Sequence, residues 1–185
     1  LIELRLVYFT VADTRGAGYL DTDHFGIRFP ERASYFSLTG IAQRWLRDLL
    51  WDVLSERLRA PDCPRTGGAF DNARRGCVEL GAVDDLTTYP DVYAAMLRFV
   101  ADQRHRERTG LASLAVHRSD GKASTVTATT RKIVLDAVRK VLRTALESGR
   151  VERLGLDRRF VLAAPLSPPS TAAPRRPFPD QVARA

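Results

Sequence analysis

The segment from residue 122 to residue 160 constrains the fold most, because it holds the best-defined helical pattern in the chain. Ser124 and Thr125 are expected to cap a long helix, and Ser148 with Gly149 to end it. Between them, apolar residues recur at three- and four-residue spacing: Val134, Ala137, Val138, Val141, Leu142, Ala145 and Leu146. So long an apolar stripe needs a partner surface along its length, which predicts a helical bundle.

The net positive charge of the protein comes from residues 91–160, the part of the sequence that includes this segment. The 185 residues hold 29 Lys and Arg against 22 Asp and Glu. Residues 91–160 contain 15 of the basic and 8 of the acidic residues, which leaves 14 of each elsewhere. On the last helix, Lys132, Arg139 and Arg143 are expected to lie opposite the apolar stripe. This concentration is typical of proteins that meet a polyanion, because Lys and Arg bound to phosphates release condensed counterions.

Three further helices are expected upstream of this segment. A long helix over residues 39–59 carries apolar residues at helical spacing, with Thr39 as its cap and Pro61 as its end. A shorter helix is predicted over residues 70–80. Another, over residues 91–108, follows a proline at the favoured first position and precedes a glycine.

The remaining segments show weaker patterns. Residues 1–10 alternate as a strand with one buried face would. Residues 14–30 are expected to form a loop with a short extended piece near residues 25–29, and residues 111–121 a connecting loop. Six of the ten prolines lie between residues 165 and 179, which predicts an extended tether over residues 164–176.

These patterns predict a mainly α-helical protein in three parts. Residues 1–64 form an N-terminal extension with the long helix over 39–59 and a short strand. Residues 67–160 form a small bundle of about four helices. Residues 161–185 form a Pro-rich linker.

Several classes of protein and site are disfavoured. Cys63, Cys77 and the three histidines show no metal-ligand spacing, so neither a metal nor another cofactor is expected. No apolar run approaches the roughly 20 residues that cross a bilayer, and no secretory signal is evident. The expectation is a cytoplasmic protein without a membrane partner.

The order of helices, and the sequence S-T-V-T-A-T-T-R-K-I-V-L-D-A-V-R-K-V-L-R-T-A-L-E-S-G-R over residues 124–150, resemble a known family. They look like the N-terminal core-binding (SAM-like) domain of tyrosine recombinases, the phage-integrase family, in which a Thr-initiated helix closes a small helical bundle. Residues 70–80 and 91–108 resemble its first two helices. The sequence R-R-P-F-P-D-Q-V over residues 175–182 resembles the entry into the catalytic domain. The resemblance departs from the family at residues 151–159, which lack the usual Asn-Pro, and does not cover residues 1–64.

The resemblance implies a DNA-binding part of a site-specific integrase, acting in DNA integration and recombination. It implies double-stranded DNA as a partner, with other recombinase protomers as a second kind of partner. Tyrosine recombinases cut DNA with a tyrosine nucleophile that follows an H-x-x-R motif. Residues 105–108 read His-Arg-Glu-Arg, but all five tyrosines lie upstream of them. With the catalytic domain missing, the chain is not expected to be an enzyme.

Ten residues are predicted to contact DNA. The threonines at the start of the last helix offer hydroxyls and backbone N–H groups, and basic residues converge from neighbouring elements. Thr127, Arg131 and Lys132 are expected to reach base edges, whereas Arg139 and Arg143 would hold the phosphate backbone. The full set is Arg104, Arg106, Arg108, Lys122, Thr125, Thr127, Arg131, Lys132, Arg139 and Arg143.

Two other functions remain open on the sequence alone. One is a helix-turn-helix regulator, against which stands the long separation between the last two helices, about 16 residues instead of three or four. The other is a helical interaction module without nucleic acid. This function would be favoured if the positive charge were dispersed over the folded surface.

Overall fold

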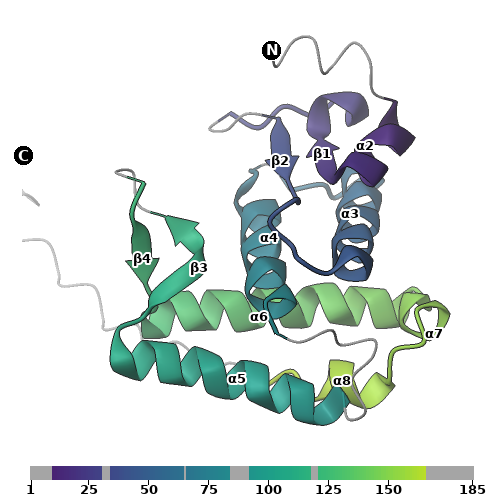
Figure 1. Cartoon of the computed structure of the whole chain (residues 1–185). Coiled ribbons are helices and arrows are strands. Elements are labelled where there is room, and N and C mark those ends of the chain that lie inside the picture. The colour runs from purple at the N-terminus through teal and green to yellow at the C-terminus, as the bar shows by residue number, and fades with distance from the viewer. Residues whose placement is uncertain (1–9, 31–33, 65, 84–91, 118–120, 166–185) are drawn as a thin grey trace, which may run out of the picture.

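The computed structural model describes residues 10–30, 34–64, 66–83, 92–117 and 121–165. These residues are mainly helical, as the sequence predicts, with seven α-helices, one 3-10 helix and four short strands (Figure 1). In chain order the elements are α2 (Val11–Ala17), β1 (Tyr19–Asp21), η1 (Thr22–Phe25), β2 (Tyr35–Ser37), α3 (Arg44–Arg59), α4 (Gly68–Gly81), α5 (Val92–Thr109), β3 (Ala112–His117), β4 (Ala123–Thr125), α6 (Ala128–Glu147), α7 (Arg150–Arg153) and α8 (Arg158–Leu162). The predicted strand over residues 1–9 and the tether from residue 166 onward lie outside the described residues.

α6 is the helix on which the others pack. In Figure 1 it runs between α5 on one side and the pair of α3 and α4, which cross it steeply, on the other. Five of the seven predicted stripe residues are buried, Val134, Val138, Val141, Leu142 and Ala145, and Leu135 joins them. Ala137 and Leu146 are only partly buried. The helical pattern therefore placed the core side of this helix correctly.

α4 approaches α6 closely at Gly76. A Cβ atom at this position would lie 3.1 Å from Cγ2 of Val138 and 3.2 Å from the backbone oxygen of Val134. The missing side chain thus lets the two helix backbones approach closely.

α5 and α8 cover a further part of α6. α8 packs against both α5 and α6, and Met96, Phe99 and Phe160 are fully buried there. Gln103 of α5 is also fully buried, as the pattern of α5 suggested. These contacts place the last turns of the described chain within the helical core.

The N-terminal elements form a layer over α3 and the start of α4. β1 and β2 pair in antiparallel fashion, with Leu20 opposite Phe36. The ring of Phe70, at the start of α4, lies 5.5 Å from that of Phe29 and 5.9 Å from that of Phe36, measured between centroids. Trp51 of α3 is buried and donates from its indole nitrogen to the backbone oxygen of Tyr19 at 2.8 Å.

A single hydrophobic cluster joins these elements across the expected boundary at residues 64–67. It extends from Leu20 to Ala164, because α3 packs on both α4 and α6. The two free cysteines lie on either side of the same junction. Cys77 is buried within α4, whereas Cys63 is half-buried in the turn after α3 and its thiol donates to the carbonyl of Pro64 at 3.7 Å.

The predictions for residues 14–30 and for the start of α3 were wrong. Residues 11–25 form α2, β1 and η1 instead of a loop, and Thr10 begins α2 through a reciprocal capping box with Asp13. α3 starts after Gln43, not at Thr39, since buried Ile41 closes a turn onto Leu38 before the helix begins. The side chain of Gln43 donates instead to the carbonyl of Val83 at 2.7 Å.

The segment between α5 and α6 also differs from the prediction. Residues 112–117 and 123–125 form the antiparallel strands β3 and β4 instead of a plain loop. Ser124 and Thr125 therefore belong to a strand and do not cap α6. The cap is Thr127, whose hydroxyl accepts from the backbone N–H of Thr130 at 3.1 Å.

Within the described ranges, no helix combines the length and the apolar character needed to cross a membrane. Nor do three or more His, Cys, Asp or Glu side chains of these ranges group as metal ligands.

Candidate nucleic-acid interface

Three basic side chains follow one exposed side of α6. Lys132, Arg139 and Arg143 are separated by seven and four residues, so they share one side of the helix. That side faces away from the buried stripe, and all three side chains remain partly or fully exposed. None of them forms an ion pair or hydrogen bond within the described part of the chain. Their charges are therefore available to an external anion.

α5 adds two cations to this surface. Arg104 and Arg108 are one helical turn apart, both are exposed, and neither is paired among the described residues. We call Arg104, Arg108, Lys132, Arg139 and Arg143 the basic face.

The ends of α5 and α6 are joined by an ion pair. Arg131, in the first turn of α6, contacts Glu107 of α5 at 2.6 Å, and both side chains are about one quarter exposed. Each partner is next in sequence to a member of the basic face, Lys132 or Arg108, so the pair fixes the two helices to each other at this end of α6. Arg131, predicted to reach base edges, is engaged with Glu107 in the free protein.

Arg106 holds the β3–β4 hairpin and does not extend outward. Its guanidinium binds Asp102 at 2.7 Å and donates to the backbone oxygen of Ala112 at 3.0 Å. Arg106 is half-buried, unlike Arg104 and Arg108. The structure thus divides the predicted basic residues of α5 into two exposed side chains and one that supports the fold.

The hairpin and the start of α6 carry the remaining predicted residues. Lys122 precedes β4 and Thr125 ends it, and both are exposed. Thr127 is exposed as well, although its hydroxyl serves as the helix cap. These three residues lie in the same short stretch of chain that leads into the basic face.

Glu79 of α4 anchors the hairpin, a role that the sequence analysis missed. It is 3% exposed. Its Oε1 accepts hydrogen bonds from the Ser113 hydroxyl at 2.6 Å and from the backbone N–H groups of Leu114 at 2.8 Å and Ala115 at 3.3 Å. Its Oε2 accepts from the Gln103 amide at 3.2 Å. The sequence did contain one indication of this role: Glu79 is an acidic residue next to Leu80, in a helix whose other buried residues are mostly apolar.

Arginines elsewhere are mostly neutralised by local carboxylates. Arg15 donates to both oxygens of Asp52 at 2.8 and 3.0 Å, and Arg150 donates to both oxygens of Glu56 at 3.0 and 2.8 Å. Buried Asp71 receives two arginines, Arg74 at 2.9 Å and Arg75 at 2.7 Å. The five side chains of the basic face have no such carboxylate partners among the described residues, so they form a region of uncompensated positive charge.

His105 and Arg108 do not form part of a strand-cleaving site with the described tyrosine of the same helix. Tyr93 lies twelve residues before His105 on α5, a separation of about 18 Å along a helix. His105 is exposed.

Comparison of the chain with models of protein families, with curated proteins and with solved structures returned no match.

Proposed function

We propose that this protein binds duplex DNA through the basic face and the start of α6. The observation that carries the proposal is the row of Lys132, Arg139 and Arg143, unpaired on one side of the longest helix, while most other arginines are neutralised. An unpaired cation gains from a phosphate both its own ion pair and the release of a condensed counterion. A cation already bound to a carboxylate must first give up that partner.

The function that fits this surface best is that of the core-binding part of a site-specific tyrosine recombinase. α4, α5, α6 and α8 would form its bundle of about four helices, with α2, α3 and the β1–β2 pair as an added layer. In this proposal the chain positions DNA and performs no cleavage itself. Residues 105–108 then serve as part of α5, with Arg108 as a phosphate contact.

The helix-turn-helix alternative receives less support from the geometry. Such a motif needs two helices joined by a turn of three or four residues. Here Thr109, the last residue of α5, and Ala128, the first of α6, are separated by the β3–β4 hairpin. A protein-binding module remains the competing function, and the response of binding to salt distinguishes the two.

The test is a titration of a labelled 25-base-pair duplex at several salt concentrations. If five or six phosphates are neutralised, the logarithm of the association constant should fall against log salt with a slope between about −4 and −6. Arg139→Ala and Arg143→Ala should each reduce that slope by about 1.

The matched control is Arg44→Ala, which removes the same charge from an 80% exposed side chain on α3. It should leave the slope nearly unchanged. A salt-independent affinity, or an equal loss in all three variants, would contradict a defined interface at the basic face.

A further inference from the structure

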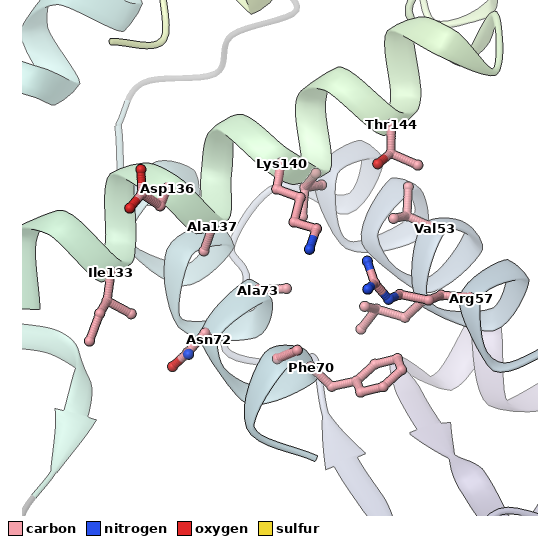
Figure 2. Close-up of a pocket in the computed structure, with 13 residues that line it drawn as sticks. Val53, Arg57, Phe70, Asn72, Ala73, Ile133, Asp136, Ala137, Lys140 and Thr144 are labelled. Atoms are coloured by element: carbon pink, nitrogen blue, oxygen red, sulfur yellow. The ribbon is translucent and has the colours of Figure 1, made fainter. Parts of the chain in front are cut away.

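A pocket of about 330 Å³ lies between α3, α4 and α6, around the helix from the basic face (Figure 2). Its walls are largely apolar, with Phe70 and Ala73 from α4, Val53 from α3 and Ala137 from α6 among them. The volume is at the lower end of the range that small-molecule sites occupy. Such walls suit the apolar body of a small ligand.

Two cationic side chains enter this pocket from different helices. Figure 2 shows the guanidinium of Arg57, from the last turn of α3, and the amino group of Lys140, from α6, directed into the same space. Neither side chain has an ion pair or hydrogen-bond partner among the described residues. Lys140 lies about 60° around α6 from Arg143 of the basic face, and its side chain lines the pocket.

The Nε atom of Arg57 is buried without a hydrogen-bond partner. The Nε atoms of Arg47 and Arg75 are buried in the same way, but those two arginines are ion-paired, with Asp48 and Asp71 respectively. Arg57 is therefore the member of this group whose charge is also uncompensated. An unsatisfied buried donor costs free energy, and an anion bound between Arg57 and the exposed Lys140 would supply an acceptor.

Asp136, the acidic side chain that lines the pocket, does not supply an anion to Arg57 and Lys140. Asp136 lies at the end of the pocket near Ile133, and its carboxylate is turned away from the two cations in Figure 2. Asp136 and Lys140 are one turn apart on α6, yet they form no ion pair. The polar groups nearer the cations include the hydroxyl of Thr144, which can donate a further hydrogen bond.

We propose that this pocket binds a small ligand with an apolar body and a single anionic group, a carboxylate or a phosphate. The anion lies between Arg57 and Lys140, where the planar guanidinium can donate two parallel hydrogen bonds. The apolar body lies against Ile133 and Ala137 of α6, whose side chains keep exposed surface in the pocket. The site is independent of DNA binding, since it uses none of the residues of the basic face.

The first experiment compares two fluorescent probes of similar shape. 8-Anilinonaphthalene-1-sulfonate carries an apolar body and an anionic group, whereas N-phenyl-1-naphthylamine lacks the anion. The folded protein should bind the sulfonate at least about tenfold more tightly, because a charge-assisted hydrogen bond contributes on that order. Arg57→Gln and Lys140→Gln should each remove most of this preference, while Arg57→Lys should retain part of it.

The control variant is Arg139→Gln, which removes a charge from the same helix outside the pocket. It should keep the preference for the sulfonate, and circular dichroism should show that all four variants remain folded. Equal binding of the neutral probe, an unchanged affinity in Arg57→Gln, or an equal loss in Arg139→Gln would overturn the proposal.

Nuclear magnetic resonance distinguishes the two kinds of anion. Benzoate, phenyl phosphate and neutral benzyl alcohol are titrated into ¹⁵N-labelled protein, and the Nε–H signal of Arg57 is followed. The signal should shift with at least one of the two anions, since its buried donor gains an acceptor, and the tighter anion identifies the ligand class. A shift that benzyl alcohol reproduces, or no shift with either anion, would overturn the assignment of the anion to Arg57.

Discussion

At the scale of single residues, the buried carboxyl group of Glu79 connects the β3–β4 hairpin to the helical core. All four of its donors are neutral, and they come from α5 and β3. A carboxylate can accept at both oxygens, whereas the amide of glutamine accepts at one and donates at the other. Oε1 of Glu79 has three donors, whereas Oε2 has one, the Gln103 amide, whose own oxygen is buried without a partner.

Glu79→Ala should lower the free energy of unfolding by about 2–3 kcal/mol, because the Ser113 hydroxyl and the backbone N–H of Leu114 then lose their buried acceptor. Urea unfolding followed by circular dichroism measures the loss. Glu147→Gln, an exposed change at the end of α6, should stay within about 0.5 kcal/mol of the parent protein. Similar stabilities for the two variants would show that the hydrogen bonds of Glu79 do not stabilise the fold.

The ion pair of Glu56 and Arg150 should give a small dependence of stability on pH. The hydrogen bond from Arg150 holds the pKa of Glu56 below its ordinary value of 4.5. A carboxyl group with a lowered pKa stabilises the fold fully above its unfolded pKa, and the effect is lost as the pH falls through the folded pKa. Since the Glu56 side chain is 56% exposed, we expect less than about 1 kcal/mol.

Glu56→Gln should therefore be slightly less stable than the parent at pH 7, and the difference should shrink as the pH falls below the ordinary pKa of 4.5. Thermal unfolding across this range measures the difference. Asp62→Asn is the control, since Asp62 is exposed and forms no ion pair within the described residues. A difference that grows as the pH falls would contradict the assignment.

At the scale of elements, the close crossing of α4 and α6 sets the shape of the core. A Cβ atom at Gly76 meets side chains of α6 and also the backbone oxygen of Val134, which cannot rotate away. The two helices would have to separate by a few tenths of an ångström. Gly16, in α2, has open space around its missing Cβ.

Gly76→Ala and Gly16→Ala should change stability in opposite directions. Alanine favours a helix over glycine by about 1 kcal/mol, so Gly16→Ala should raise the melting temperature slightly. At Gly76 overpacking should outweigh this gain and lower the melting temperature by about 2–6 °C. Differential scanning calorimetry measures both. An increase in both variants would mean that α4 and α6 can separate at little cost.

The long helices were predictable, whereas the elements between them were not. α4, α5 and α6 each bury a stripe that repeats over many turns, so periodicity alone located them. β3 is short, and it is fixed by Glu79, thirty or more residues earlier in the chain. No local pattern contains that contact. Thr39 resembles a helix cap in sequence, but Ile41 is buried in the preceding turn, so the helix begins later.

At the scale of the whole molecule, the core crosses the boundary that composition predicted at residues 64–67. Phe70 is fully buried and contacts Phe29 and Phe36 from the N-terminal layer. Leu80 is equally buried, and a Cβ atom at neighbouring Gly81 would lie 3.3 Å from Cγ2 of Ile41 and 3.5 Å from Cδ2 of Leu46. The prolines at positions 61 and 64 and the glycines at 67 and 68 thus lie between two helices that share one core.

A fragment of residues 66–165 should therefore fold less cooperatively than the full chain. Without residues 10–64, one side of α4 and part of α6 lose their apolar cover, and exposed side chains of this size each cost about 1.5–3 kcal/mol. The slope of urea unfolding and the heat capacity change measure the loss of cooperativity. If the fragment unfolds in a sharp transition at nearly the same urea concentration as the full chain, the predicted domain boundary at residues 64–67 would be supported.

The segment that carries the net positive charge was predictable from the sequence. Which of its basic side chains are ion-paired and which are not could not be predicted. Lys132, Arg139 and Arg143 could be grouped by helical spacing alone. Spacing could not show that Arg131 is bound to Glu107 or that Arg106 supports the hairpin, because both contacts depend on the fold. The unpaired cations of the pocket were missed for the same reason, since Arg57 and Lys140 lie 83 residues apart.

The two cysteines make the protein easy to study by site-selective labelling. Burial raises the pKa of the Cys77 thiol to about 12, so that side chain stays protonated and unreactive while the fold is intact. Burial also raises the pKa of Cys63, but that thiol is half-exposed. A maleimide dye would thus attach at one position, in the turn where α3 meets α4, and its emission would follow the junction of the two parts of the chain without any engineered cysteine.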